Sequence, residues 1–397
     1  MAIIMRTAIV FRERLLAPSE TFIIEQAQML RRYKPVLAGL RRVEPGLRHN
    51  LPEILLREGT GTWDKIAARV YRQFPFAPAF IQRLRAQNPS ILHVHFATDA
   101  VHALSIANAL ELPLVVSLHG CDVTPTDAHF AQSVSGRHFL SHRSRLFARA
   151  SAFLCVSQSI CAAALRAGFP EAKLHVLYTG VDCERFRPAD VERDPKLILF
   201  VGRLVEVKGC EFLLRAMAHL QQHNPQAHVE IIGDGPLRSD LEALAGKLAI
   251  RASFRGVQNS AEVLRSMARA RILCNPSIKA SSGQTEGFGM VFAEAQAVGT
   301  PVVSFASAAI PEVVKHGHTG LLCPEGDIVA LATSLRTLLD NSELWASMSH
   351  QARTWVKERF DIARQTEKLE LIYDECIARQ RRIASPFPEA YGHCAGS

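Results

Sequence analysis

Short apolar runs alternate with segments of helical periodicity along the chain of 397 residues. This alternation is typical of α/β proteins, in which each strand of a parallel sheet is followed by a helix that returns the chain. In the first half the pattern predicts helices at 21–32, 98–109 and 157–167. The predicted strands are 7–11, 36–40, 91–94, 114–118, 152–156 and 173–176.

The same alternation restarts after a polar stretch, 182–194, which we interpret as an interdomain linker. Beyond it the predicted strands are 197–201, 229–232, 252–254, 272–275 and 301–304. The expected fold is α/β, with two Rossmann-like doubly wound domains at 1–187 and 188–365. A helix with one apolar stripe is expected at 366–384, and a flexible tail at 385–397.

Composition places the chain among globular proteins, with 48% hydrophobic and 21% charged residues. Nine cysteines form no C-x-x-C pair, which favours reduced, mostly buried thiols over a disulfide framework or a zinc site. No apolar run reaches the roughly 18 residues that a membrane span needs. The first eleven residues have the pattern of a strand, not of a signal peptide. We expect a cytoplasmic protein, free or peripheral on the inner face of the cytoplasmic membrane.

The net charge of +8 is unevenly distributed. Residues 1–187 contain 23 Lys/Arg and 14 Asp/Glu, a balance of +9, whereas residues 188–397 contain 23 and 24, a balance of −1. The basic half is either a solvated face or a surface for anionic lipid headgroups or a lipid-diphosphate acceptor. Nucleic acid is a poor candidate, because no basic motif interleaved with aromatic residues is present.

Residues 63–74 have the pattern of a basic amphipathic helix. Its apolar stripe consists of Trp63, Ile66, Ala67, Val70, Tyr71 and Phe74. Its cations, expected on another face, are Lys65, Arg69 and Arg72. Such a helix packs on the protein core or contacts a membrane, and the pattern leaves both open.

Two carboxylates, Glu286 and Glu294, bracket a glycine-spaced turn that leads into a helix predicted at 291–297. Their separation is just over two helical turns, at about 3.6 residues per turn. Free N–H groups of the turn and the positive end of a helix suit a diphosphate. Carboxylates on either side suit sugar hydroxyls, so the segment favours a phosphate ester that carries carbohydrate.

A second candidate site opens the second half, where a predicted strand ends just before Gly202 and a helix is expected at 210–220. Arg203 and Lys208 precede that helix. Two cations and a helix N-terminus suit one diphosphate, with arginine as a bidentate fork and lysine as a point charge. Ligands of doubly wound sheets bind where parallel strands end. Three further segments follow predicted strands in this way: 231–236, 255–257 and 275–277.

Together these segments resemble the retaining nucleotide-sugar glycosyltransferases of family 4, which have the GT-B fold. The stretch from Glu286 to Glu294 is similar to the E-x7-E signature of that family, and Gly202-Arg203 with Lys208-Gly209 is similar to its G-R…K-G pattern. The resemblance covers about residues 6–380. It implies two domains that face each other across a cleft, with the C-terminal helix crossing back to the first domain.

The resemblance also implies roles for individual residues. Glu286 would contact hydroxyls of the donor sugar, Glu294 would hold the ribose diol, and Val257 would lie where relatives bind the base through backbone groups. The residues expected to bind the donor diphosphate are Arg203, Lys208, Gly287, Phe288 and Gly289.

In the first half, His119 follows an apolar strand and is expected to face the interdomain cleft. The family places a histidine there beside the donor sugar, so His119 and Glu286 are the expected catalytic residues. His93 and His95 lie two apart on another predicted strand and point to one face. Without Asp, Glu or Cys at ligand spacing nearby, we interpret them as histidines that line or support the cleft and expect no metal site.

Residues 17–23 form a predicted turn with Ser19 as N-cap of the next helix. The segment 18–23, P-S-E-T-F-I, resembles that of bacterial members that assemble polysaccharide. Many relatives carry a Gly-Gly pair in this loop, and this chain does not. The departure leaves open how the first domain approaches the donor diphosphate. Ser19, Glu20 and Thr21 form the candidate donor or acceptor loop, in which Glu20 or Thr21 is expected to face the ligand.

No D-x-D sequence occurs, so the usual carboxylate device that holds a metal on a nucleotide sugar is missing. We therefore expect no cofactor or metal, with cations and helix N-termini neutralising the leaving diphosphate. The expected function is retaining transfer of a hexose from a nucleotide sugar to a saccharide or polyprenyl-diphosphate-linked acceptor in polysaccharide assembly. A sugar-nucleotide epimerase of the same fold and a non-catalytic nucleotide-sugar-binding subunit stay open as alternatives.

Overall fold

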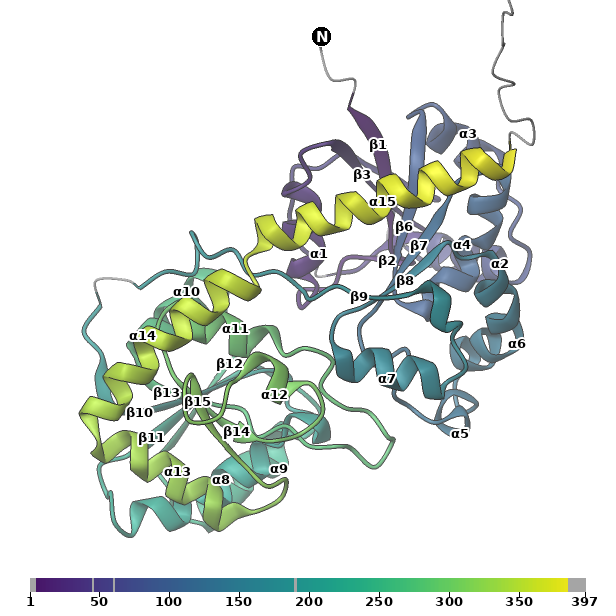
Figure 1. Ribbon diagram of the computed structural model, residues 1–397. Coiled ribbons are helices and arrows are strands. Elements are labelled where there is room, and N and C mark those ends of the chain that lie inside the picture. The colour runs from purple at the N-terminus through teal and green to yellow at the C-terminus, as the bar shows by residue number, and fades with distance from the viewer. Residues whose placement is uncertain (1–4, 45, 60, 189–190, 385–397) are drawn as a thin grey trace, which may run out of the picture.

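The computed structural model describes residues 5–44, 46–59, 61–188 and 191–384. Two parallel sheets, each with helices packed around it, form two bodies that lie side by side (Figure 1). This architecture confirms the predicted α/β fold with two Rossmann-like domains. The exact bounds of the domains stay predictions, and the expected flexible tail, 385–397, lies outside the described residues.

The first sheet has seven strands, all paired in parallel, in the order β5-β3-β1-β6-β7-β8-β9. Its central strands are buried on both faces, which explains their unbroken apolar runs. The strands are β1 (Arg6–Phe11), β3 (Tyr33–Gly39), β5 (Glu53–Leu55), β6 (Pro89–His95), β7 (Leu114–Leu118), β8 (Ala152–Cys155) and β9 (Leu174–Val176). The helices are α1 (Thr21–Gln28), α2 (Thr62–Gln73), α3 (Pro78–Arg85), α4 (Ala97–Ala109), α5 (Asp127–Phe130), α6 (Val134–Arg149) and α7 (Gln158–Arg166).

The second sheet has six parallel strands in the order β12-β11-β10-β13-β14-β15. The strands are β10 (Asp194–Val201), β11 (His228–Ile232), β12 (Ala252–Gly256), β13 (Ala270–Cys274), β14 (Val302–Phe305) and β15 (Gly320–Cys323). The helices are α8 (Cys210–Gln221), α9 (Arg238–Lys247), α10 (Ser260–Arg269), α11 (Met290–Ala297), α12 (Ile310–Val313), α13 (Ile328–Asp340) and α14 (Ser342–Arg359). Short strands escaped the sequence pattern: β5, β15, and the separate pair β2 (Arg14–Leu15) and β4 (Arg41–Arg42).

Both sheets reverse their strand order at one place, and ligands of such sheets bind there. In the first sheet the reversal lies between β1 and β6, and in the second between β10 and β13. The loops after these four strands therefore surround the expected binding region.

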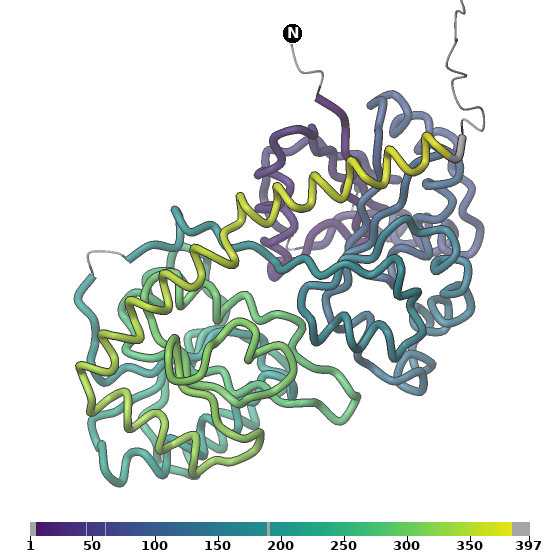
Figure 2. The backbone as a smooth tube through the Cα atoms, viewed as in Figure 1, coloured from purple at the N-terminus to yellow at the C-terminus, as the bar shows by residue number. Residues whose placement is uncertain are grey.

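The last helix, α15 (Ile362–Ala384), leaves the second body and runs across the first (Figure 2). Leu369 and Tyr373 are fully buried against the first sheet, in one cluster with Ala8 and Ile91. The helix begins four residues before the predicted start at 366, and its return to the first domain confirms that part of the predicted fold.

The first helix differs from its prediction at both ends. Glu20 occupies the N-cap position and no side chain caps the helix there, so the assignment of Ser19 as N-cap is wrong. The helix ends at Gln28, not Arg32. The backbone N–H groups of Arg31 and Arg32 instead donate to the carboxylate of Glu370 on α15, at 2.8 and 2.7 Å. A contact distant in sequence therefore ends the helix early.

Helix α2 turns its predicted apolar stripe mostly towards solvent. Of that stripe Tyr71 is buried, where its hydroxyl lies 2.8 Å from Ser105 Oγ. Asp64 is also buried, because it accepts from the backbone of Gly61 and pairs with Arg57. The exposed members are Trp63, Ile66, Val70 and Phe74. The predicted basic face is also incomplete, because Arg72 forms an ion pair with Glu13.

The eight described cysteines are free thiols, and six of them are buried, as their scattered spacing predicted. Within the described part of the chain, no helix combines the length and the apolar character that crossing a bilayer requires.

Candidate active site

A cavity of about 690 Å³ lies between the two domains, at the ends of the strands where both sheets reverse their order. It brings together nine of the residues that the sequence singled out: Ser19, Thr21, His119, Arg203, Lys208, Glu286, Phe288, Gly289 and Glu294. Three others, Glu20, Gly287 and Val257, do not line it.

The turn that carries Lys208 is locked to the loop after β13. Gly209 has a positive φ of 65°, and a Cβ atom built there would lie 1.9 Å from the carbonyl oxygen of Pro276. Only glycine allows this approach. The backbone N–H of Ile278 also donates to the carbonyl of Val207, at 3.0 Å. The start of α8 and the loop that leads to Glu286 are therefore one rigid unit.

Lys208 and Glu286 form the central ion pair of the second-domain wall. Lys208 Nζ lies 2.6 Å from Glu286 Oε2, and both side chains are largely shielded from solvent. Ser277 Oγ makes a longer contact to the same oxygen, at 3.4 Å. Arg203 is exposed at the rim and has no carboxylate within ion-pair distance among the described residues. This part of the wall thus offers two cations and one carboxylate to a ligand.

The two domains touch at Gly287. A Cβ atom built on Gly287 would lie 2.1 Å from the carbonyl oxygen of His119, so no larger residue fits without moving the domains. Ser157 Oγ donates to the carbonyl of Gly287, at 2.7 Å. Gly287 is therefore a contact between domains in this conformation and does not line the cavity, and its role in diphosphate binding stays a prediction. Gly289, by contrast, lines the cavity as the N-cap of α11 with a positive φ of 81°.

A second contact between the domains lies beside the first. Glu312 of α12 accepts from the backbone N–H groups of Gln158 and Ser159 at the start of α7, both at 2.8 Å. A carboxylate at a helix N-terminus is favourable, because it satisfies free N–H groups and the helix dipole. Tyr178 donates to the same carboxylate, at 3.1 Å. These contacts hold the cleft in its present width.

Glu294 lies on α11 and is half-buried in the cavity wall. Burial raises the pKa of its carboxyl group to about 7; nearby Glu25 raises it further, and Arg185 opposes the shift. No hydrogen bond of the Glu294 side chain occurs among the described residues. Its oxygens are available to a pair of ligand hydroxyls, as the predicted contact with a ribose diol requires.

The first-domain wall centres on His119. Its Nε2 lies 3.0 Å from Nδ1 of His95, and the rings of Phe22 and Phe96 lie 4.9 and 4.6 Å from its own. Burial, together with nearby His93 and Arg12, lowers the pKa of His119 to about 3. The imidazole is therefore neutral at pH 7 and acts by hydrogen bonding, not as a cation.

His93 and His95 support this wall, as their spacing predicted. Their rings lie 4.5 Å apart on the same face of β6. His93 forms hydrogen bonds with Ser117 Oγ at 2.8 Å and with the hydroxyl of Tyr373, on the C-terminal helix, at 2.6 Å. His95 forms its hydrogen bond with His119. No group of three or more metal-ligating side chains gathers anywhere in the described part of the chain.

The loop before α1 places its three predicted residues differently. Ser19 and Thr21 line the cavity, but the carboxylate of Glu20 points into the first domain. There Glu20 binds the guanidinium of Arg12 at 2.8 Å and accepts from the backbone of Ala17 at 3.0 Å. Its buried position makes it a support of the loop, so of the two alternatives Thr21, not Glu20, faces the cavity.

Val257 lies just outside the cavity. Its side chain is 70% exposed, whereas its neighbours Gln258 and Asn259 line the cavity wall. Residues 258 and 259 thus form this part of the cavity wall, and base binding at Val257 stays a prediction.

Sequence reasoning missed two residues of the site. Asp122 is buried and accepts from the backbone N–H groups of Ala97, His119 and Gly120, at 2.8 to 3.0 Å. The sequence could have indicated this role, because Asp122 follows Gly120 by two residues and an aspartate there can accept hydrogen bonds from the backbone N–H groups of the turn. Arg185 also lines the cavity and pairs with Glu25 at 2.6 Å. Its place in the predicted linker gave no signal.

Two doubly wound domains that meet at their strand ends, with cations and carboxylates between them, form a cleft of the class that binds phosphate-bearing ligands such as nucleotides. Two family models match the chain: "Glycosyltransferase Family 4" over residues 20–185 and "Glycosyl transferases group 1" over residues 183–355. The chain belongs to the family 4 glycosyltransferases with the GT-B fold.

Curated relatives agree with this assignment. The amylovoran biosynthesis glycosyltransferase AmsK of Erwinia amylovora is 31% identical over 68% of this chain and 66% of its own length. WcaL of Escherichia coli, a putative colanic acid biosynthesis glycosyltransferase, is 30% identical over 67% of this chain and 66% of its own. The chain therefore spans about two thirds of the length of these relatives.

Solved structures show the same fold. Anabaena HepE (Alr3699), solved with UDP and glucose, has a TM-score of 0.73 at 20% identity, over 93% of this chain and 99% of that one. Sucrose-phosphate synthase of Thermosynechococcus elongatus has a TM-score of 0.76 at 19% identity, over 94% and 100%. At these identities the likeness concerns the fold.

Proposed function

We propose that this chain transfers a hexose from a nucleotide sugar to a saccharide acceptor, with retention of anomeric configuration, in the assembly of a polysaccharide. The observation that carries the proposal is the Lys208–Glu286 pair, which faces His119 across the interdomain cavity. Lys208 and Arg203 would meet the diphosphate, and Glu286 would turn to the sugar hydroxyls that replace its lysine partner.

The chemistry follows from where charge develops. As the bond between sugar and diphosphate breaks, negative charge grows on the leaving phosphate, and preorganised cations and N–H groups stabilise it. Lys208, Arg203 and the start of α11 at Gly289 supply these groups. A phosphate oxygen of the leaving group would accept the proton of the acceptor hydroxyl on the same face of the sugar, which retains the configuration. These cations and N–H groups can neutralise the leaving diphosphate, which supports a reaction without a metal ion or cofactor.

Donor and acceptor follow from the relatives. HepE was solved with UDP and glucose, so a UDP-hexose is our first choice of donor. AmsK and WcaL are named for amylovoran and colanic acid biosynthesis, which supports a saccharide acceptor. We propose that this acceptor is carried on a polyprenyl diphosphate at the inner face of the cytoplasmic membrane. The relatives named above are transferases and give no support to an epimerase.

The test is a panel of UDP-, GDP- and ADP-hexoses. A donor that binds only the folded state raises the melting temperature by an amount set by its concentration relative to Kd. The active donor is then incubated with lipid-linked saccharides extracted from a polysaccharide-producing bacterium, with and without EDTA, and the new linkage is examined by NMR.

Transfer with retained configuration, unaffected by EDTA, is the expected result. An inverted product would contradict the retaining mechanism. A new nucleotide sugar formed without acceptor would instead indicate an epimerase. Binding of a donor without turnover on any acceptor would indicate a binding subunit.

The outer face of α2 supports a contact with the membrane. Among the described residues, Trp63, Phe74 and Phe76 are the most exposed aromatic side chains, at 74%, 74% and 84%. Exposed aromatic rings mark interaction surfaces, and Lys65 and Arg69, which are also exposed on α2, match anionic headgroups. We propose that this face rests on an anionic membrane, where the lipid-linked acceptor is found.

Co-sedimentation with vesicles of phosphatidylcholine and phosphatidylglycerol tests this contact. The wild type is expected to bind, and a variant with Trp63, Phe74 and Phe76 changed to Ser is expected to stay in solution. The matched control changes Val329 and Leu371, which are also exposed but lie elsewhere, to Ser and should bind like the wild type. Equal binding of all three proteins would reject a membrane contact at α2.

A further inference from the structure

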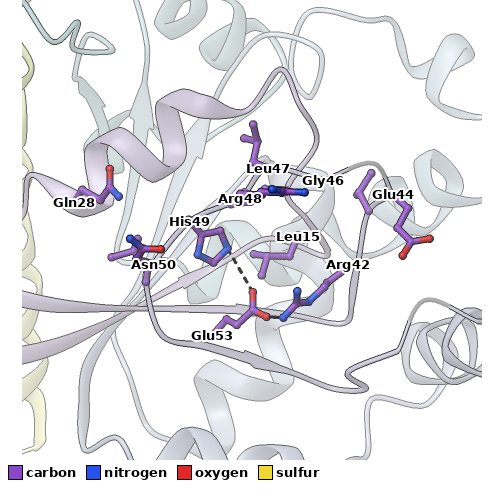
Figure 3. A pocket seen from close by; sticks show the side chains of 13 residues that line it. Leu15, Gln28, Arg42, Glu44, Gly46, Leu47, Arg48, His49, Asn50 and Glu53 are labelled. Atoms are coloured by element: carbon purple, nitrogen blue, oxygen red, sulfur yellow. Dashed lines mark ion pairs between the residues drawn. The ribbon is translucent and has the colours of Figure 1, made fainter. Parts of the chain in front are cut away.

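A second cavity, of about 770 Å³, lies in the first domain beside the donor cleft (Figure 3). Leu47 lines both cavities. Helix α1 also connects them, because Thr21 near its start lines the donor cleft and Gln28 at its end lines the second cavity. Seven residues of helix place these two side chains about 10 Å apart along the axis. The two cavities are therefore neighbours in the same wall.

Main-chain hydrogen bonds hold the second cavity in shape. The backbone N–H of Val43 donates to the carbonyl of Leu15 at 2.8 Å, and that of Leu47 donates to the carbonyl of Leu16 at 3.2 Å. The short parallel pair of β2 and β4 continues this connection. The buried side chains of Leu15 and Leu16 give the cavity an apolar floor.

A cluster of polar side chains faces this floor. Glu53 stands at its centre: one carboxylate oxygen pairs with Arg42, and the other lies 3.4 Å from Nε2 of His49 (Figure 3). The His49 side chain is only 9% exposed. Burial lowers the pKa of His49, so its imidazole is neutral at pH 7.

The neutral imidazole leaves one ring atom poorly paired. When Nε2–H faces the carboxylate of Glu53, Nδ1 presents a bare lone pair. That atom is buried and makes no well-formed hydrogen bond among the described residues, and the nearby backbone of Leu51 only partly opposes the fall in the pKa of the ring. Buried polar atoms are almost always paired, so a poorly paired acceptor in a cavity wall favours a ligand that donates.

The remaining polar groups fit a ligand rich in hydroxyls. The amides of Gln28 and Asn50 both donate and accept, and Arg48 is exposed and has no carboxylate within ion-pair distance among the described residues. A sugar presents neighbouring hydroxyls to such groups and an apolar ring face to leucine side chains. A cavity of this volume falls within the usual range for small-molecule sites.

We infer that this cavity binds a sugar unit of the acceptor, adjacent to the unit that receives the hexose. The inference rests on the proposed function, because the acceptor saccharide would extend from the donor cleft past Leu47 into the second cavity. Glu53, His49 and Arg48 would then determine which saccharides the enzyme accepts.

Saturation-transfer NMR with the methyl α-glycosides of glucose, galactose, mannose and glucuronic acid tests the inference. The protein is first saturated with a nucleoside diphosphate, so that the donor cleft is occupied. The nucleoside diphosphate is the one contained in the hexose donor that stabilises the protein in the panel. At least one glycoside is expected to give a signal. Its affinity should fall about tenfold in Glu53→Gln and in Arg48→Ala, the effect of one lost charge-assisted hydrogen bond.

The control is Glu58→Gln, which removes an equal charge from a side chain that is 84% exposed and does not line the cavity. It should bind the glycoside like the wild type. Arg48 is exposed, so its variant should fold even if Glu53→Gln does not. No signal from any glycoside, or variants that bind like Glu58→Gln, would overturn the inference.

The nucleotide readout separates this inference from the proposed function. If all variants are stabilised by the nucleotide and only glycoside binding distinguishes them, the inference holds and the donor binding that the proposed function requires is intact; the transfer assay then decides the proposed function. If no nucleotide stabilises the wild type, the proposed function fails, and the glycosides are then measured on the protein alone, where Glu53→Gln and Arg48→Ala still decide the second cavity.

Discussion

The two walls of the donor cleft are held together in different ways. The first-domain wall is neutral and already complete: His119 is bonded to His95, enclosed by Phe22 and Phe96, and its loop is anchored by Asp122. The second-domain wall is charged, and its lysine and glutamate are bound to each other. The first wall can therefore receive a ligand without rearranging, whereas the second must exchange its own ion pair for the charges of the ligand.

The comparison also separates net charge from local charge. The first half of the chain carries a balance of +9 and the second half −1. Yet the cations expected to meet the diphosphate, Arg203 and Lys208, belong to the second half. A net charge describes how a domain attracts partners at long range, while a binding site depends on where a few charges are fixed.

The largest expected effect comes from the charged wall. Lys208→Ala removes a cation from the place where charge develops on the leaving diphosphate, so kcat should fall by about 10²–10³-fold. Steady-state kinetics with the donor found in the panel measures the change. Lys247→Ala, which removes an exposed lysine at the end of α9, is the matched control and should leave kcat unchanged. A Lys208→Ala enzyme with wild-type kcat would remove the basis for the contrast between the walls.

A substitution in the neutral wall should mainly lower the stability of the protein and displace His119. In Asp122→Asn an amide NH₂ replaces one oxygen, so at least one of the buried N–H groups of Ala97, His119 and Gly120 loses its acceptor. An unsatisfied buried donor costs about 1–3 kcal/mol, and a displaced His119 should lower kcat roughly tenfold. Urea denaturation and kinetics measure both effects.

The matched control for this change is Asp127→Asn. Asp127 lies five residues further on, but its side chain is 62% exposed and pairs with Arg143 at the surface. It should change stability by less than about 1 kcal/mol. If Asp122→Asn is no more destabilising than Asp127→Asn, the His119 loop does not depend on this carboxylate.

Sequence patterns predicted the parts of the fold that depend on local order. Central strands such as Leu114–Leu118 were predicted correctly because burial on both faces leaves an unbroken apolar run. Lys208, Glu286 and His119 were placed in one cavity because each follows a strand of a doubly wound sheet.

Features that depend on specific contacts outside the periodic pattern were not predicted. The sequence of α2 shows that the helix is amphipathic, but the ion pair of the buried Asp64 with Arg57 and the contact of Tyr71 with Ser105 decide which side faces inward. Glu20 has the right position for a cleft residue, yet Arg12 draws it into the domain. Ion pairs between residues seven or eight positions apart leave no periodic trace in a sequence.

The smallest expected effect concerns Glu294, whose pKa is raised to about 7 chiefly by burial. A raised pKa means that the folded state binds the proton more tightly than the unfolded state, so the buried charge destabilises the fold above pH 7. That penalty is relieved as the pH falls towards the ordinary value of 4.5. Glu294→Gln should therefore be more stable than the wild type by about 1–2 kcal/mol at pH 8, after allowance for partial exposure, and the gain should disappear near pH 5.

Nucleotide affinity should have the opposite pH dependence to stability, because binding favours the ionised form of Glu294. An ionised Glu294 accepts from two ribose hydroxyls more strongly than a protonated one, so wild-type affinity should decline as the pH falls below 7. Glu294→Gln should bind the nucleotide more weakly at pH 8 and lack that part of the pH dependence. Thermal unfolding and nucleotide titration at pH 5, 6, 7 and 8 measure both trends on the same proteins. Parallel pH profiles for the two proteins would show that Glu294 does not titrate in this range, which would contradict the raised pKa of its carboxyl group.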